Sequence, residues 1–191
     1  LMDVSLVVLG LVALALSYTT ALVAGEVRWR RVTRNIRGRM ASARVAPAAR
    51  AVSFDGLDAL PPPVQRMLRH ALAPGVPAVT AVRIRHVGTI NAAEKGERWS
   101  RFRSDQWVVT SRPGFDWNAR VAIAPGLPVR VHDAYAQGEG MLRASLLGLV
   151  DVARLEGAGD IAEGELMRFL AESCWYPTVL LPGNGVEWEA I

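Results

Sequence analysis

Histidine and cysteine, the usual catalytic bases and nucleophiles, are few in this chain and lie far from one another in sequence. The one cysteine, Cys174, is a candidate nucleophile, with His132 or His70 as its base. Nothing around Cys174 matches the surroundings of a known cysteine nucleophile, so a structural cysteine is the simpler interpretation. A single cysteine also excludes an intrachain disulfide and a multi-cysteine zinc site, and three histidines argue against a histidine-rich metal centre. We therefore predict no catalytic residue, no metal site and no cofactor.

Carboxylates beside a histidine or beside each other are the second possible source of catalysis. His132 and Asp133 are adjacent, but neighbours on a strand point to opposite faces of a sheet, so they do not easily serve one site. Asp105 or Asp133 together with Glu139 makes a carboxylate pair, but no spacing rule supports it. These residues favour a structural interpretation over general acid–base catalysis.

Aromatic side chains point more clearly to a binding function. Large rings on one face of a sheet that a helix covers are typical of an open barrel holding an apolar ligand, although plain core packing accounts for the same rings. Arg168 and Glu172 are four residues apart on an expected helix and form either an ordinary surface pair or polar groups at the mouth of a pocket. The predicted ligand contacts are Trp99, Trp117, Tyr135, Arg168, Glu172 and Trp175.

An uncharged apolar segment opens the chain. Residues 4–25 form a run of 22 residues without a charge. A helix of this length spans roughly 33 Å, enough for the ~30 Å hydrocarbon layer of a bilayer. A buried core helix and a signal peptide are the alternatives, but a signal core is usually shorter and follows basic residues, whereas only Asp3 precedes this run. The sequence predicts a transmembrane helix within residues 1–25.

A basic block follows the apolar segment. Residues 26–50 hold eight arginines and one acid, a charge of +7, which leaves −3 for the rest of a chain whose net charge is +4. We predict a basic juxtamembrane helix over 26–50, continuing along the membrane surface to about Pro47. Its partner is anionic lipid rather than nucleic acid, whose binders usually spread cations and aromatics over a folded face. The predicted membrane-interface residues are Arg28, Trp29, Arg30, Arg31 and Arg34.

The same arginines bear on orientation. Positive charge directly after a membrane helix favours keeping that side in the cytoplasm. The globular part is therefore expected in the cytoplasm on a single-pass anchor, with the exported side as the alternative. The chain begins with Leu1 rather than methionine, so upstream residues would be able to reverse this topology.

The remaining residues predict an α+β domain at 61–191, after a linker at 51–60. Prolines 61–63 open a short helix at 64–72, and the hydrophobic period changes to two from about residue 79. The alternating or apolar segments indicate a curved antiparallel sheet, a partial open barrel, at 82–90, 99–108, 115–123, 129–135 and 141–155, the last as one strand or two. One or two helices cover it, including one that Asp160 caps with Glu163. A further strand at 186–191 stops inside its pattern, which suggests that the domain is truncated at its C-terminus.

Three segments resemble an uncharacterised bacterial family of membrane-anchored proteins without an assigned activity. They are GFDWNARV (114–121), VHDAYAQGEGMLRASLLGLV (131–150) and RFLAESCWYPTVLLP (168–182), and the resemblance spans about residues 60–191. The family's strand-rich layout is in turn similar to periplasmic lipoprotein carriers, whose half-barrels hold acyl chains. That second likeness implies an exported domain, which conflicts with the charge argument.

Together these observations predict a membrane-tethered, non-enzymatic domain that binds a lipid or another apolar ligand in a concave sheet. The alternative is an accessory or scaffold domain that pairs with a membrane-protein partner through an exposed sheet edge.

Overall fold

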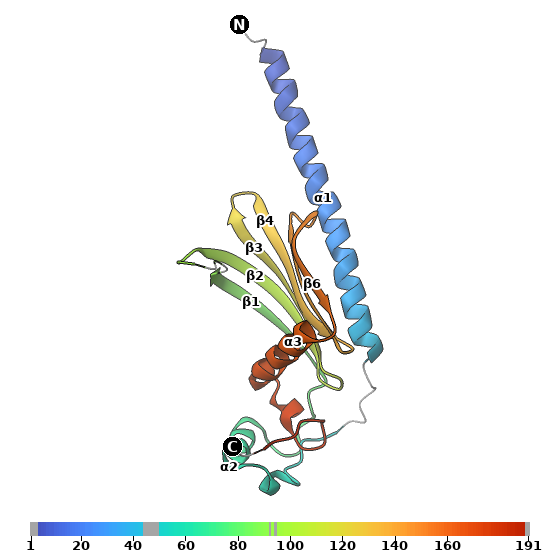
Figure 1. The fold of residues 1–191 in the computed structure, drawn as a ribbon, viewed down its shortest axis with the longest axis vertical. Coiled ribbons are helices and arrows are strands. Elements are labelled where there is room, and N and C mark those ends of the chain that lie inside the picture. The colour runs from blue at the N-terminus through green and yellow to red at the C-terminus, as the bar shows by residue number, and fades with distance from the viewer. Residues whose placement is uncertain (1–3, 44–49, 92, 94, 190–191) are drawn as a thin grey trace.

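A long helix running past a six-stranded sheet dominates the architecture (Figure 1). The structure is a computed structural model that describes residues 4–43, 50–91, 93 and 95–189. Helix α1 (Val4–Ala43) lies along one face of the sheet, and helix α3 (Asp160–Ala171) packs on the other. The predicted α+β class, with an apolar N-terminal helix and an open, curved antiparallel sheet, is confirmed.

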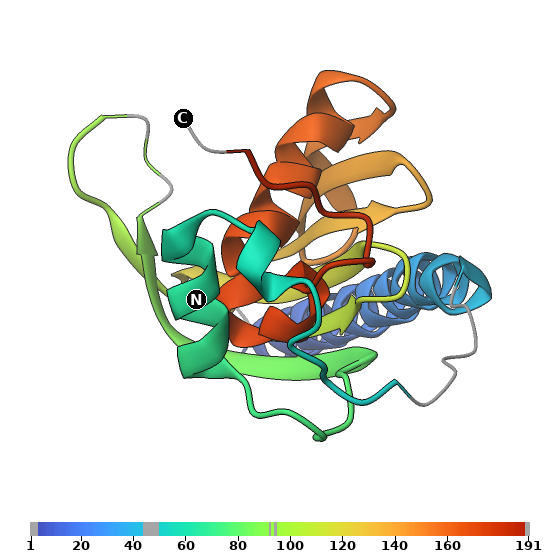
Figure 2. The ribbon, with the colours of Figure 1, turned by 90° about the horizontal axis from the view of Figure 1, so that it is seen from below.

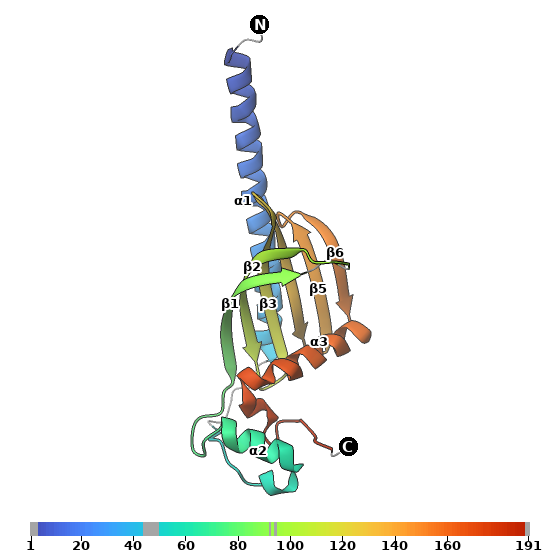
Figure 3. The same cartoon turned by 90° about the vertical axis from the view of Figure 1, so that its left-hand side faces the viewer.

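The two halves of α1 have different environments. An 18-residue apolar window in the first half has a mean hydropathy of 2.3 and no buried residues. Among the described residues, α1 is the one helix that is long and apolar enough to cross a membrane. Its length and composition fit either a membrane anchor or a signal sequence. The second half is amphipathic and lies against the sheet (Figures 1 and 3).

The packed half of α1 buries a stripe of side chains at helical spacing. Trp29, Ile36 and Met40 are at most 3% exposed, and Ile36 and Met40 join a small apolar cluster with Ala134 and Ala136 of the sheet. Residues 29, 33, 36 and 40 recur on one helix face, as a buried stripe requires. The helix of the basic block, expected along a membrane surface, therefore lies on this domain's own sheet up to Ala43. Residues 44–49 of that block are outside the described residues.

A close backbone contact joins the end of the apolar half of α1 to the sheet. A Cβ added at Gly25 would lie 2.0 Å from the Leu147 carbonyl oxygen, and one added at Gly148 would lie 2.8 Å from the Gly25 carbonyl oxygen. Only glycine permits this approach at both positions. The turn between the last two strands therefore sits directly against the point where the apolar helix ends.

The sheet is a simple antiparallel meander in the order β1-β2-β3-β4-β5-β6. Its strands confirm the predicted runs, and residues 141–155 prove to be parts of two strands separated by a turn at Leu147 and Gly148, both with left-handed backbone angles. The strands are β1 (Ala81–Asn91), β2 (Trp99–Val109), β3 (Gly114–Ala124), β4 (Leu127–Ala136), β5 (Glu139–Leu146) and β6 (Val150–Gly157).

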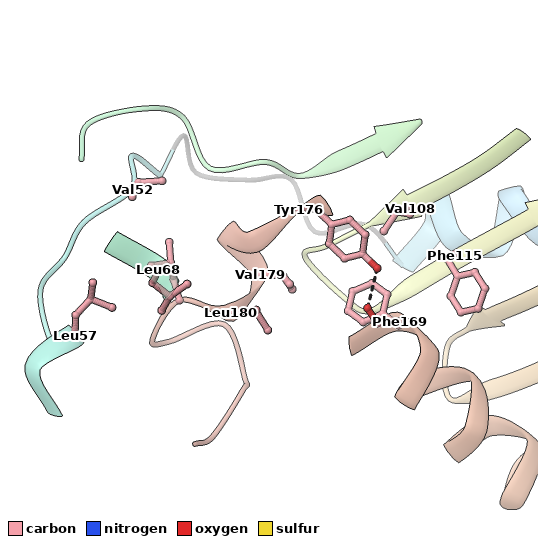
Figure 4. Close-up of a cluster of buried hydrophobic side chains, with 10 residues drawn as sticks. Val52, Leu57, Leu68, Val108, Phe115, Phe169, Tyr176, Val179 and Leu180 are labelled. Atoms are coloured by element: carbon pink, nitrogen blue, oxygen red, sulfur yellow. Dashed lines mark hydrogen bonds between the residues drawn. The ribbon is translucent and has the colours of Figure 1, made fainter. Parts of the chain in front are cut away.

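Short helices and the C-terminal segment close the end of the sheet that lies far from the N-terminus (Figure 2). They are η1 (Leu57–Ala59), α2 (Pro62–Ala71), η2 (Glu172–Trp175) and η3 (Pro177–Leu180). Their main buried cluster includes Leu57, Leu68, Phe115, Phe169 and Tyr176 (Figure 4), and the Tyr176 hydroxyl donates a 2.8 Å hydrogen bond to the Phe169 carbonyl. The segment expected as a linker at 51–60 thus supplies core residues.

Two local predictions were wrong. Helix α3 has Gly159 at its N-cap, without a side-chain hydrogen bond that caps the helix, so Asp160 and Glu163 do not form the expected capping pair. Both acids lie in the first turn, where their negative charge interacts favourably with the helix dipole. Residues 186–189 form no strand, because the chain there covers the core near Leu180 and Trp188 donates to the Leu180 carbonyl. Residues 190–191 are outside the described residues.

Candidate functional site

A cluster of charged and polar side chains lies where α3 meets the sheet. Arg168 of α3 pairs with Asp133 of β4, and its Nε donates to Glu172 Oε1 over 2.9 Å. The buried Gln106 of β2 donates from its amide to the other oxygen of Glu172. The predicted pair of Arg168 and Glu172 therefore forms, and the fold adds Asp133 and Gln106 to it. We call Gln106, Asp133, Glu165, Arg168 and Glu172 the α3 cluster.

Two aromatic rings hold the Arg168 side chain from the sheet side. Its guanidinium carbon lies 5.1 Å from the Phe115 ring centre and 5.2 Å from the Trp117 ring centre, distances at which a cation is attracted to a ring face. Arg168 also keeps 27% of its side chain exposed. It can therefore present a fixed positive charge at the edge of the aromatic surface, bounded by two carboxylates.

Glu165 is the most perturbed group in the α3 cluster. Burial in the first place, and then a hydrogen bond and charge repulsion from Asp133, raise the pKa of Glu165 from 4.5 to about 9. Asp133 Oδ1 and Glu165 Oε2 are buried, and no other described group donates a hydrogen bond to them. A hydrogen bond between two carboxyl groups requires a proton on one of them, so Glu165 is protonated at neutral pH and donates.

Replacing Glu165 by glutamine tests this assignment. The unfolded chain releases the Glu165 proton near pH 4.5 and the folded chain keeps it to about pH 9, so the free energy of unfolding falls as pH rises between these values. Glu165→Gln keeps a donor and removes this loss. We expect it to be more stable than the native chain by about 3.5 kcal/mol at pH 7, at ~1.4 kcal/mol for each pH unit above 4.5.

Urea unfolding at pH 5, 7 and 8.5 measures the difference. The native chain should lose stability across the series, and Glu165→Gln should lose much less. The matched control is Glu163→Gln, an exposed residue on the same helix. Equal pH slopes for the native chain and Glu165→Gln would contradict a buried protonated Glu165.

The sheet register brings most of the predicted aromatic contacts to the α3 face. Trp117 pairs in register with Gln106 and Asp133, and Tyr135 pairs with Phe115, so all of these lie on that face. Trp175, in η2, is 51% exposed and its ring centre lies 5.3 Å from that of His86. Trp99 does not join them, because it alternates with Ser100 and lies on the α1 face, 60% exposed.

A second polar network fills the contact between α1 and the sheet. The His132 ring and the Asp116 side chain are fully buried and lie 2.6 Å apart, Nδ1 to Oδ1, while His132 Nε2 lies 3.0 Å from the Thr33 hydroxyl. Arg37 Nε donates to Asp116 Oδ2 over 2.7 Å. Trp29 stacks on His132, with ring centres 4.5 Å apart. The network resembles a hydroxyl–histidine–carboxylate triad, but its burial between α1 and the sheet gives it a structural role.

The predicted membrane-interface residues have divided environments. Arg28 pairs with Asp151 and donates to the carbonyls of Gly148 and Leu149, and Trp29 is enclosed by the sheet. Arg30, Arg31 and Arg34 remain exposed. Arg30 pairs with Glu26, and Arg31 lines a groove of about 750 Å³ between α1 and β4–β6. Their contact with lipid stays a prediction.

The pairing of Cys174 with His132 is not assembled in the structure. Cys174 is exposed beyond the end of α3, whereas His132 is buried under α1 on the opposite face of the sheet. His132 and Asp133 point to opposite faces, as expected for strand neighbours. In the part of the chain that the structure describes, no group of three or more His, Cys, Asp or Glu side chains is placed to hold a metal ion.

The sequence interpretation missed the acids that receive the basic helix. Asp105, Asp116 and Asp151 each pair with arginines of α1, although they lie far from it in sequence. One signal was present, since the α1 residues at 29, 33, 36, 37 and 40 fall on one helix face. A helix that only rests on a membrane has no need of Thr33 and Arg37 on its apolar face, so these two polar residues indicate packing against protein.

The fold and site define a class of protein with an apolar N-terminal helix and an open antiparallel sheet that a C-terminal helix covers. The comparison with protein families shows that residues 58–191 match the family of unknown function DUF6920. The chain belongs to that family. No curated protein and no solved structure matches it.

Proposed function

We propose that this chain is a membrane-tethered, non-enzymatic domain that binds a lipid or another apolar ligand on the α3 face of its sheet. The supporting observation is the stretch of that face beyond α3, which carries half-buried apolar side chains. Those that share the face by register are Ile90, Phe102, Trp117, Val129, Val131 and Leu146. Half-buried rings and aliphatic groups on a curved sheet suit an acyl chain or a similar ligand.

The position of this stretch relative to α1 favours a ligand that comes from the bilayer. Helix α3 crosses the end of the sheet far from the N-terminus, and the uncovered end lies toward the apolar half of α1 (Figures 1 and 3). A chain entering from that end would pass over Trp117 and meet the α3 cluster last. Arg168 supplies a partly exposed positive charge there for a polar or anionic group of the ligand.

The test is the lipid content of the purified full chain. Native chain extracted in mild detergent should retain bound lipid by native mass spectrometry, and returning lipid to a delipidated sample should change the tryptophan emission. The change should be lost in Trp117→Phe. A lysine on the apolar stretch, Val131→Lys, should abolish retention, while Met167→Lys on the solvent side of α3, where Met167 is 65% exposed, should not. A folded native chain with neither bound lipid nor an emission change would contradict the proposal.

Membrane anchoring on the cytoplasmic side is part of the same proposal. The support is the apolar half of α1 followed at once by arginines, a pattern that keeps the following residues in the cytoplasm. The single, exposed Cys174 is a natural reporter of sidedness. A membrane-impermeant maleimide should label it in lysed cells and not in intact cells, and labelling in intact cells would place the domain outside.

The open edge at β6 supports a second candidate function, a scaffold that pairs with a partner protein. Val150 and Val152 are 62% and 61% exposed on a strand that has a neighbour on one side only. Such an edge is a template for strand addition. A stoichiometric partner that copurifies with native chain and is lost from Val152→Lys, in samples that hold no lipid, would favour this function over the first.

A further inference from the structure

Four arginines on the α1 face of β1–β3 form no ion pair with a described residue, although Asp105 is the register partner of one of them, Arg85. Arg85, Arg101, Arg103 and Arg120 are exposed, and their side chains make no ion pair or hydrogen bond with a described residue. Other arginines of the same face are paired: Arg83 binds Asp105, Arg130 binds Glu26, and Arg143 binds Asp151. The unpaired set is thus a distinct patch beside the helix contact.

The sheet register places like charges directly opposite each other in this patch. Arg103 of β2 is the register partner of Arg120 of β3, and Arg120 is in turn the register partner of Arg130 of β4. Like charges at directly opposed positions destabilise a sheet. Glu26 neutralises Arg130, but no described acid neutralises Arg103 or Arg120. An external anion would remove that repulsion.

The arginines surround a shallow groove rather than a flat surface. The groove has a volume of about 780 Å³. Its lining combines three of the arginines with small and apolar groups, namely Val87, Thr89, Arg101, Arg103, Arg120 and Ala122. Val87, on the rim of the groove, is 90% exposed. Guanidinium groups beside an exposed aliphatic group suit an anionic head group joined to an apolar chain.

The groove lies at the level where α1 leaves the bilayer. Arg120 is one strand from Arg130, whose partner Glu26 directly follows the uncharged run. The adjoining β3–β4 turn reaches further, since the Tyr18 hydroxyl donates to the Gly126 carbonyl within the apolar half of α1. Figure 1 shows the ends of β1 and β2 bent away from α1, which turns their α1 face toward the side from which the apolar half extends.

We infer that the groove bounded by Arg101, Arg103 and Arg120 binds the phosphate groups of anionic phospholipids in the bilayer that α1 enters. The inference rests on the proposed membrane anchor, and it assigns head-group binding to the sheet rather than to the helix. Arginine forks match phosphate oxygens with paired hydrogen bonds. The lipid surface then holds the domain at a second point, with the β3–β4 turn and its exposed Ile123 and Leu127 at the interface.

An environment-sensitive fluorophore at the groove tests the inference in the full chain. Val87→Cys, in a Cys174→Ser background, is labelled with a nitrobenzoxadiazole dye and reconstituted into vesicles of phosphatidylcholine alone or of equal parts phosphatidylcholine and phosphatidylglycerol. We expect blue-shifted emission in the anionic vesicles only. Each arginine near an anionic surface contributes about fivefold to docking, so a triple Arg101→Gln, Arg103→Gln, Arg120→Gln variant should lower the ratio of docked to undocked domain by roughly 100-fold.

A matched triple variant controls for charge alone. Arg66→Gln, Arg112→Gln and Arg154→Gln remove three exposed arginines outside the groove and should leave the blue shift unchanged. Equal emission in both vesicle types, or equal loss in the two triple variants, would overturn the inference. Binding of a DNA oligonucleotide that the groove variant abolishes would also overturn the lipid assignment.

The failure of the anchor has a separate signature. A chain without a membrane anchor would float with neither type of vesicle, whereas failure of the groove alone would leave vesicle-bound chain with no dependence on lipid charge. The Trp117-dependent change in tryptophan emission reports on the α3 face and is independent of both readouts.

Discussion

Arg37→Ala should destabilise the chain by about 3–5 kcal/mol, because it leaves a buried carboxylate without its cation. Asp116 is fully buried, and Arg37 both donates to it and pairs with Asp105. Asp105 keeps other partners: although burial alone raises its pKa, the hydrogen bonds from Arg83 and Trp107 and the charge of Arg37 hold the pKa of Asp105 below its usual range. The cost of Arg37→Ala therefore falls mainly on Asp116.

Urea unfolding of the detergent-solubilised full chain measures this loss. The matched control is Arg34→Ala, an exposed arginine three residues earlier on α1 whose removal should change stability by less than about 0.5 kcal/mol. Asp116→Asn combined with Arg37→Ala should recover part of the loss, because the stranded charge is gone. If Arg37→Ala and Arg34→Ala behave alike, the buried ion pair does not hold α1 on the sheet.

Trp29→Ala should cost a similar amount, about 3–5 kcal/mol, through a cavity in the same contact. The Trp29 side chain is 1% exposed, stacks on His132 and donates from Nε1 to Asn118 Oδ1 over 2.9 Å. Its loss removes the largest side chain that α1 buries and leaves the Asn118 oxygen without that donor. The effect should appear as a lower urea midpoint with loss of protection from hydrogen exchange over residues 29–43.

Trp99→Ala is the control for Trp29→Ala. Trp99 is 60% exposed on the same face of the sheet, so its removal should leave the midpoint nearly unchanged. A midpoint for Trp29→Ala that equals that of Trp99→Ala would mean that the second half of α1 is not docked in solution.

The strands and the main helices could be predicted from the sequence because their periods are local. Alternation of apolar and polar residues fixes a strand and its two faces without knowledge of its neighbours. The alternation does not say which set of one strand shares a face with which set of the next. Alternation alone is therefore compatible with Trp99 and Trp117 on one face, whereas the β2–β3 register, in which Gln106 faces Trp117, puts them on opposite sides.

The docking of the basic helix could not be predicted, because its partners are scattered acids. Arg28, Arg37 and Arg39 pair with Asp151, Asp116 and Glu139, which lie at least 79 residues away in sequence. A block of arginines after an apolar helix is typical of contact with lipid head groups. In the fold, several arginines of this block pair with acids of the sheet. The arginines that stay unpaired lie on β1–β3, where the sequence shows them only as polar members of alternating strands.

A cross-linking measurement tests most directly whether the second half of α1 and the sheet form one body. The Gln137 amide lies 3.1 Å from the Ser42 hydroxyl near the end of α1. In a Cys174→Ser background and in vesicles, Ser42→Cys with Gln137→Cys should be joined rapidly and almost completely by a short bis-maleimide. Arg34→Cys, on the exposed side of α1, should join Gln137→Cys far more slowly. Equal rates for the two pairs would contradict the packing of the basic helix on the sheet and would favour a helix that lies on the membrane surface instead.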